Sequence, residues 1–137
     1  NVIPGRVELT AEIRGLDETT LDAAEAALQA RAAADGATFA RISAKEPVVS
    51  DPAVVAAVET ACRDLGLAYR RMPSGAGHDA MCMAAITRQG MIFVPSRRGI
   101  SHSPEEYTAP EDCVTGARVL LGTLLALDAA LDATRDS

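Results

Sequence analysis

The chain has 137 residues, with two Tyr, two Phe and no Trp. This length suits one ordinary domain or two small pieces of a larger one, and the shortage of aromatic side chains favours packed helices over sheets. With 13 Lys and Arg against 19 Asp and Glu, the net charge is −6, which argues against nucleic acid as a partner because its phosphates would be repelled.

The three cysteines predict a reducing environment. Cys62, Cys82 and Cys113 are far apart, odd in number and in no CxxC pair, which argues against a disulfide framework or a structural zinc knuckle. No apolar run approaches the roughly 18 to 20 residues of a membrane span, and no basic-then-apolar leader is present. We therefore expect a cytoplasmic location and no membrane partner. Because the chain begins with "NVIPG" and lacks an initiator Met, we expect a processed chain or a segment of something longer.

The first third of the chain predicts a β-α-β piece over about residues 2–46. "VELTAEIR" alternates apolar and polar residues, as in a strand with one buried face, and Arg14 lies on the polar face. A helix follows, with Asp17 as its N-cap and Gly36 as its stop, and "TFARISA" has the pattern of a second strand. Prolines in "KEPVVSDP" then indicate a domain boundary near residues 46–51.

The second part predicts alternating helices and strands. A helix from Pro52 to Leu65 has Asp51 as N-cap and Gly66 at its end. "LAYRRM" and "MIFVPS" have the character of short strands, and "HDAMCMAAI" between them has helical spacing. The last helix starts after Thr108 and runs to about residue 133. Its apolar positions, which we expect to face a core, are Val114, Ala117, Leu121, Leu124 and Leu131.

His78 follows a Gly-Ala-Gly turn in "SGAGHDAM". Such glycines let the backbone approach a ligand closely, and amides that lead into a helix can hold an anion or a carboxylate. An equally good interpretation is a glycine turn with a capping His-Asp pair, because short glycine motifs are common.

His102 lies in "GISHSPEE", a loop after a predicted strand, where a neutral imidazole would suit a metal ion. The alternative is a solvated loop histidine. A catalytic zinc needs about three protein ligands, and a two-metal site needs more. Two isolated histidines do not supply them, so a catalytic metal site would need residues from outside this chain.

Arg14 and Asn1 would suit the carboxylate of a substrate. Guanidinium binds carboxylate with two parallel hydrogen bonds, and an amide adds direction. The alternative for Arg14 is an ordinary surface arginine on an exposed strand face.

Four stretches, "NVIPGRVELTAEIRGLD", "MPSGAGHDAMCMA", "IFVPSRRGISHSPEEYT" and "DCVTGARVLLGTLLALD", stand in an order that resembles the C-terminal portion of the hydantoinase/carbamoylase-type amidases. That family includes N-carbamoyl-L-amino acid hydrolases, allantoate amidohydrolases and β-ureidopropionases. The resemblance implies an α/β fold, as part of a two-domain, di-metal, aminopeptidase-like hydrolase. Residues 1–46 would be the second half of its lid and dimerisation domain, and residues 52–137 the C-terminal part of its catalytic domain.

The resemblance also implies roles for individual residues. His102 would be a metal ligand for one of two zinc or manganese ions, Gly77 and His78 would contact the substrate near its scissile group, and Asn1 and Arg14 would bind its carboxylate end. No catalytic residue falls in this segment. The upstream His-Asp segment, the bridging carboxylate, the glutamate pair and the lid histidine of the family are absent, so the segment alone would be inactive.

The implied activity is hydrolysis of the carbamoyl C–N bond of an N-carbamoyl-L-amino acid or an allantoate-like substrate by metal-activated water. The implied partners are a small ureido or amide substrate, a second copy of the chain bound through the lid, and the missing N-terminal segment. Two alternatives are a non-catalytic dimerisation or folding module, and an aminoacylase or dipeptidase of the same clan.

Overall fold

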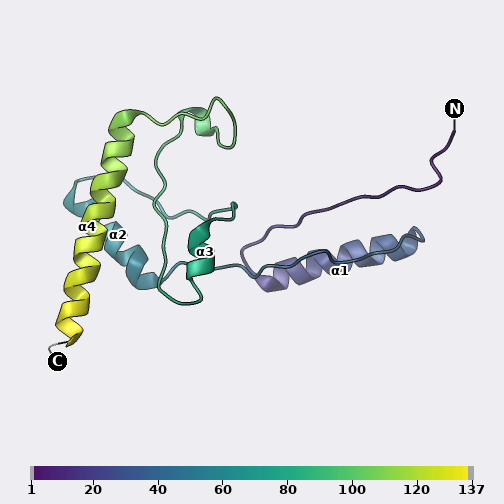
Figure 1. The fold of residues 1–137 in the computed structure, drawn as a ribbon, viewed down its shortest axis with the longest axis horizontal. Helices are drawn as coiled ribbons and strands as arrows, with labels where there is room; N and C mark the ends of the chain where they lie inside the picture. The colour runs from purple at the N-terminus through teal and green to yellow at the C-terminus, as the bar shows by residue number, and fades with distance from the viewer. Residues whose placement is uncertain (1, 136–137) are drawn as a thin grey trace. The chain divides into compact units, whose positions relative to one another are not determined.

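The computed structural model describes residues 2–135, which fall into two compact units. The first unit runs to Pro47 and also takes in Pro73–Ala76, and the second comprises Val48–Met72 and the chain from Gly77 onward. The helices, shown in Figure 1, are α1 (Glu18–Ala34), α2 (Pro52–Asp64), α3 (Asp79–Met83), the 3-10 turn η1 (Arg97–Gly99) and α4 (Pro110–Arg135). The assignment of the two parts to a lid and a catalytic domain stays a prediction.

The predicted ends of α1 are confirmed. The carboxylate of Asp17 accepts a hydrogen bond from the backbone N–H of Thr20 at 2.8 Å, which satisfies one of the amides left free at a helix start. At the other end Gly36 has a φ of 68°, a left-handed conformation that lets Ala37 donate its N–H to the carbonyl of Ala32 at 2.8 Å.

The start and end of α2 follow the same logic. One carboxylate oxygen of Asp51 accepts hydrogen bonds from the amides of Ala53 and Val54 at 2.8 and 3.2 Å, and Pro52 occupies the first turn, where its missing N–H costs nothing. Gly66 has a φ of 66° directly after the helix. Local capping chemistry therefore fixes both helices.

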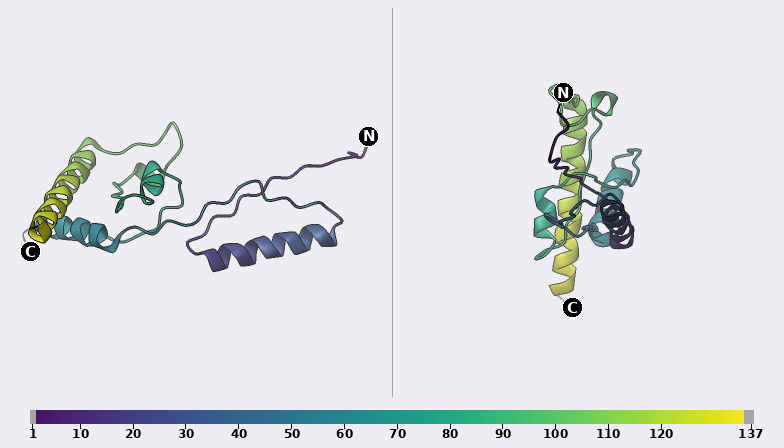
Figure 2. Two further views of the ribbon diagram at one scale, coloured as in Figure 1. Left: turned by 60° about the horizontal axis from the view of Figure 1, so that its bottom comes forward. Right: turned by 90° about the vertical axis from the view of Figure 1, so that its right-hand side faces the viewer.

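The predicted strands are not found. Between residues 2 and 135 no segment forms a strand, and the stretches 7–14, 38–44, 67–72 and 91–96 run without ladder hydrogen bonds. An alternating pattern selects a face, but a strand forms only when another strand accepts and donates its backbone hydrogen bonds. The β-α-β lid is therefore not confirmed. In its place, the segment after α1 turns back along the helix (Figures 1 and 2), where Arg41 Nε donates to Glu25 at 2.9 Å.

The core of the second unit lies between α2 and α4, which pack side by side (Figures 1 and 2). Ala61, Cys62 and Val119 are its buried apolar side chains. Gly122 permits the close approach, because a Cβ added there would lie 3.2 Å from the Cβ of Ala61. The buried hydroxyl of Thr123 donates to the carbonyl of Val119 at 2.8 Å, so it enters the core without losing a hydrogen bond.

The predicted core face of α4 is wrong. Val114, Leu121 and Leu124 are 52 to 58% exposed. The helix is apolar around most of its circumference, so periodicity alone allows more than one stripe, and the stripe with small residues brings the two backbones closest. The apolar side chains left exposed on α4 include Val114, Leu120, Leu121, Leu124 and Leu125.

A second correction concerns the length of the apolar segment. Within the described residues, Pro110–Ala133 is one helix that is long and apolar enough to cross a membrane, judged by length and composition only. The sequence expectation counted uninterrupted apolar residues, whereas a span tolerates isolated charges such as Arg118 and Asp128. The finding is weak evidence for a membrane helix, because the core helix of a soluble protein meets the same criteria.

Candidate functional site

Arg14 is held by two acceptors within the first unit. Its Nε donates to Oε1 of Glu12 at 2.9 Å, and its Nη2 lies 2.9 Å from the same oxygen. Its Nη1 donates to the carbonyl of Gly75 at 2.7 Å. Glu12 and Arg14 are two residues apart in an extended segment, so their side chains leave the same side of the backbone. Both side chains stay exposed, at 71% for Glu12 and 60% for Arg14.

The contact with Gly75 brings one predicted site residue to the predicted glycine turn. Gly75 belongs to Pro73–Ala76, which clusters with the first unit although it lies 61 residues from Arg14 along the chain. The hydroxyl of Ser74 donates to the carbonyl of Ala76 at 3.1 Å and closes the turn locally. The guanidinium of Arg14 is thus tied to a distant backbone carbonyl while it stays exposed, and its contact with substrate stays a prediction.

Gly77 lies in open space. In the part of the chain that the structure describes, a Cβ added to Gly77 would meet nothing within 4 Å. Packing therefore does not require glycine at this position, whereas close approach of a ligand to the backbone would. The contact between Gly77 and substrate stays a prediction.

His78 occupies the N-cap position of α3, but its side chain makes no capping hydrogen bond. His78 is thus the N-cap residue by position, but its imidazole does not cap the helix. The Nδ1 atom of His78 is buried, and it has no hydrogen-bond partner within residues 2–135. A buried polar atom without a partner costs about 1 to 3 kcal/mol. The contact between His78 and substrate stays a prediction.

The loop that carries His102 is closed by backbone contacts. The hydroxyl of Ser96 donates to the carbonyl of Ile100 at 2.5 Å, and the N–H of Arg97 donates to the carbonyl of Tyr107 at 2.8 Å. The guanidinium of Arg97 also lies over the ring of Tyr107, 5.1 Å from its centroid. These contacts join the two ends of the loop and fix its shape.

His102 itself has a φ of 56°, a conformation that non-glycine residues rarely adopt. Its backbone N–H donates to the carboxylate of Glu106 at 2.9 Å, and the N–H of Glu106 donates to the carbonyl of Ser103 at 3.0 Å. The side chain of His102 is exposed. Glu106 was not predicted to play this part, although its spacing of four residues from His102 was visible in the sequence.

A complete metal site does not fit these residues alone. Among the described residues no group of three or more His, Cys, Asp and Glu side chains could hold a metal ion. A catalytic zinc needs about three protein ligands. His102 thus offers an exposed imidazole on a loop whose ends are joined by hydrogen bonds, and its role as a ligand stays a prediction. Asn1, the other predicted carboxylate contact, lies outside the described residues.

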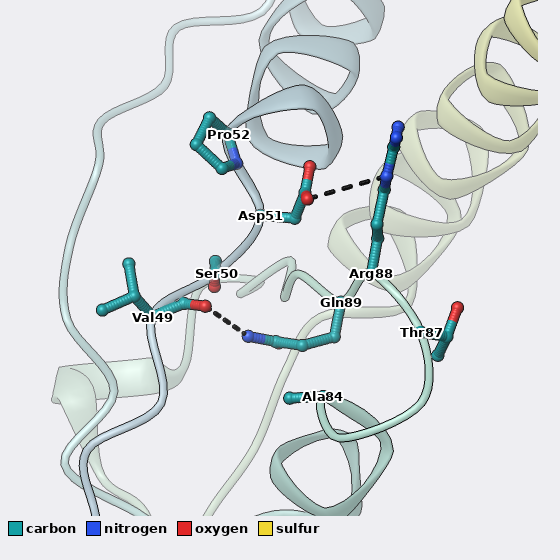
Figure 3. A pocket seen from close by; sticks show the side chains of 8 residues that line it. All are labelled: Val49, Ser50, Asp51, Pro52, Ala84, Thr87, Arg88 and Gln89. Carbon is teal, nitrogen blue, oxygen red and sulfur yellow. Dashed lines mark hydrogen bonds and ion pairs between the residues drawn. The ribbon is translucent and has the colours of Figure 1, made fainter.

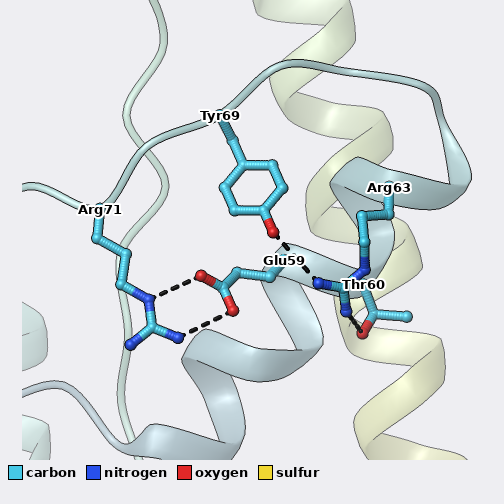
Figure 4. A network of polar contacts seen from close by, with 5 residues as sticks. All are labelled: Glu59, Thr60, Arg63, Tyr69 and Arg71. Atoms are coloured by element: carbon cyan, nitrogen blue, oxygen red, sulfur yellow. Dashed lines mark hydrogen bonds and ion pairs between the residues drawn. The ribbon is translucent and has the colours of Figure 1, made fainter.

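A polar network fixes the extended segment just before the glycine turn (Figure 4). Arg71 donates from Nε and Nη2 to the two carboxylate oxygens of Glu59, at 2.7 and 2.9 Å. Arg63 donates to the hydroxyl of Tyr69 at 3.2 Å and to that of Thr60 at 2.9 Å. Hydrogen bonding from Arg71 lowers the pKa of the Glu59 carboxyl below its ordinary value. The segment 67–72 is thus pinned to α2 by side chains rather than by a strand partner.

An open hollow lies elsewhere in the second unit, at the start of α2 (Figure 3). Gln89 donates to the carbonyl of Val49 at 3.2 Å across it, and Arg88 lies 3.8 Å from the carboxylate of Asp51. The lining residues are Val49, Ser50, Asp51, Pro52, Ala84, Thr87, Arg88 and Gln89. No predicted site residue lines this hollow.

Comparison with known proteins decides the family. Residues 6–126 match the family described as "Peptidase family M20/M25/M40". The chain belongs to this family. Within it, the M20-family chain is 40% identical over 137 residues to the N-carbamoyl-L-amino-acid amidohydrolase of Paenarthrobacter aurescens, a match that covers 93% of the chain and 32% of that protein. It is 36% identical over 138 residues to the allantoate amidohydrolase of Bacillus subtilis, with coverage of 93 and 32%.

A solved structure supports the same placement. The M20-family chain matches the amidase of the hydantoinase/carbamoylase family from Burkholderia multivorans with a TM-score of 0.73 and 42% identity, over 82% of this chain and 29% of that one. The resemblance to hydantoinase/carbamoylase-type amidases is thus confirmed. The M20-family chain spans about a third of the length of the curated relatives that it matches.

Proposed function

We propose that this M20-family chain is the substrate-binding part of an amidohydrolase that cleaves the carbamoyl C–N bond of N-carbamoyl-L-amino acids or allantoate-like substrates. The observation that carries the proposal is the guanidinium of Arg14 held 2.7 Å from the carbonyl of Gly75, at the turn that leads to His78. A substrate with a carboxylate at one end needs a cationic site, which the guanidinium of Arg14 supplies. The activities for which the relatives are named support this substrate class.

The proposed roles of this chain concern orientation. Arg14 and Asn1 bind the carboxylate of the substrate, whereas Gly77 offers an open backbone and His78 offers its imidazole near the scissile group. His102 provides one ligand to one of two divalent ions, zinc or manganese, and the remaining ligands and the general base belong to residues outside those described. The products from an N-carbamoyl substrate are carbon dioxide, ammonia and the free amino acid.

The proposed setting is a cytoplasmic homodimer whose contact lies in the lid formed by residues 1–46. The three cysteines are free thiols, which fits a reducing compartment. The remaining two thirds of the enzyme are the other partner that the proposal requires.

A chimera tests the proposed function. The part of the Paenarthrobacter aurescens enzyme that matches this chain is replaced by residues 1–137, and ammonia release from N-carbamoyl-L-amino acids is measured with zinc or manganese added. We expect the chimera to be active, and H102A and R14A variants of it to lose most of that activity. A chimera that folds with native helix content but releases no ammonia would overturn the proposal.

An aminoacylase or dipeptidase is the second candidate, because the matching family is described as one of peptidases. The same chimera distinguishes the two. N-acetyl-L-amino acids and dipeptides are compared with N-carbamoyl-L-amino acids at equal concentration, and faster hydrolysis of the amides would favour the second candidate. A folded chimera that hydrolyses none of these substrates would favour the third candidate, a non-catalytic module.

A further inference from the structure

The guanidinium of Arg14 already holds a carboxylate. Its Nε donates to Oε1 of Glu12 at 2.9 Å and its Nη2 lies 2.9 Å from that oxygen, so Glu12 sits on the Nε/Nη2 edge of the guanidinium. This edge is one that carboxylates use when they bind arginine with two parallel hydrogen bonds. We propose that Glu12 competes with the substrate carboxylate for Arg14 and thereby sets how tightly that carboxylate binds. The inference rests on the proposed function, because it takes the ligand to be the carboxylate of an N-carbamoyl amino acid.

Charge favours displacement of Glu12 over binding beside it. If Glu12 stayed, two carboxylates would lie against one guanidinium, and like charges about 4 Å apart in water repel by about 1 kcal/mol. The Glu12–Arg14 pair is easy to open, because both side chains are more than half exposed and exposed ion pairs contribute only about 0 to 1 kcal/mol. A substrate carboxylate can therefore replace that of Glu12 on the same edge.

The second contact of Arg14 keeps the arginine in place during the exchange. Nη1 donates to the carbonyl of Gly75 at 2.7 Å, and this acceptor is neutral and part of the backbone. Loss of Glu12 thus leaves one tether on the guanidinium. For this reason Glu12 is not needed to orient Arg14, and its effect is to compete with an incoming carboxylate.

The competition predicts a gain in carboxylate affinity when the charge of Glu12 is removed. A carboxylate ligand displaces Glu12 at low cost, whereas a carboxamide offers one weak acceptor and does not compete with an ionised side chain. Removal of the charge of Glu12 should strengthen carboxylate binding by about two- to fivefold, the range that corresponds to an exposed ion pair.

Binding to the 137-residue chain tests this inference without catalysis. The Nε–H signal of Arg14, assigned by its loss in R14K, is followed by NMR during titration with N-carbamoylglycine and with its carboxamide analogue. The proteins compared are the unmodified chain, E12Q and E8Q. E8Q is the matched control, because Glu8 pairs with Arg6 on the same extended segment and carries the same charge.

We expect E12Q to bind N-carbamoylglycine about two- to fivefold more tightly than the unmodified chain, E8Q to bind it as the unmodified chain does, and the carboxamide to bind weakly to all three. Weaker binding by E12Q would overturn the inference, since it would mean that Glu12 orients Arg14. Equal gains in E12Q and E8Q, or no shift of the Arg14 signal in any protein, would overturn it as well. An inactive chimera beside tighter binding by E12Q would contradict the proposed function alone.

Discussion

Arg71 donates hydrogen bonds from two nitrogens to the carboxylate of Glu59, at 2.7 and 2.9 Å. The pair ties the extended segment 67–72 to α2, and the Glu59 side chain is 17% exposed although that of Arg71 is 71% exposed. Hydrogen bonding from Arg71 lowers the pKa of Glu59 from its ordinary value of 4.5. Because the folded-state pKa is the lower one, the pair contributes stability above about pH 4.5, and that stability is lost as the pH falls through the folded-state value.

The first prediction is that E59Q unfolds at lower urea than the unmodified chain at pH 7, and that the difference narrows below about pH 4.5. Urea midpoints from circular dichroism at 222 nm, measured between pH 7 and pH 3, check this. R71K is the control, because it keeps the charge but loses the two-nitrogen contact. It should lower the urea midpoint less than E59Q does. A difference between E59Q and the unmodified chain that is the same at pH 7 and pH 3 would show that the ion pair is not its cause.

The second prediction concerns the core between α2 and α4. V119A should lower the free energy of unfolding by about 2 kcal/mol, because Val119 is only 3% exposed and the change removes two buried carbons and leaves a cavity. L121A, a change at a side chain 58% exposed on the same helix, should stay within about 0.5 kcal/mol. Urea unfolding of both variants measures the contrast. Equal losses would mean that α4 packs through another face.

The third prediction separates the backbone of His102 from its imidazole. H102G should be more stable than H102A by about 1 kcal/mol, because glycine adopts the left-handed conformation without strain. In the chimera both variants should lose hydrolysis, since both lack the imidazole. Arg98 has a similar φ of 59°, so R98G should gain stability over R98A and keep activity. An active H102G chimera would remove His102 from the proposed site.

The fourth prediction concerns Arg14 in an active chimera. R14A should raise KM for N-carbamoyl-L-amino acids by about 10- to 100-fold, the effect of losing a charged hydrogen-bonded contact, and should change kcat much less. R14K should fall between, because it keeps the charge but not the planar fork. R6A, at another arginine of the same segment, should leave KM unchanged. If R14A lowers kcat and leaves KM as it was, Arg14 does not bind the carboxylate.

The helix ends were predictable from the sequence because their causes are local. Asp17 and Asp51 cap amides two or three residues away, and Gly36 and Gly66 end helices through their own backbone conformation. Each signal acts within one turn of the chain. No distant contact is needed to interpret it.

The absence of strands in the described residues, the buried face of α4 and the surroundings of Arg14 depended on contacts between distant residues. Alternation in residues 7–14 identifies a face, but strand formation needs a partner that periodicity does not supply. The buried face of α4 follows from its fit to α2, and small residues such as Gly122 decided it rather than the leucines. The contact between Arg14 and Gly75 joins positions 61 residues apart, so no spacing rule contains it. The family resemblance predicted that the segment around Arg14 and the glycine turn both bind substrate. The roles of Gly77 and His102 stay predictions.

The reactivity of the three free thiols reports on the folding of the chain. Cys62 is buried between α2 and α4, whereas Cys82 and Cys113 are exposed. A chromogenic thiol reagent should therefore react rapidly with Cys82 and Cys113 in the folded chain, and with all three cysteines in urea. The slow reaction of Cys62 reports how often α2 and α4 separate. Their opening can therefore be followed without a mutation or a substrate.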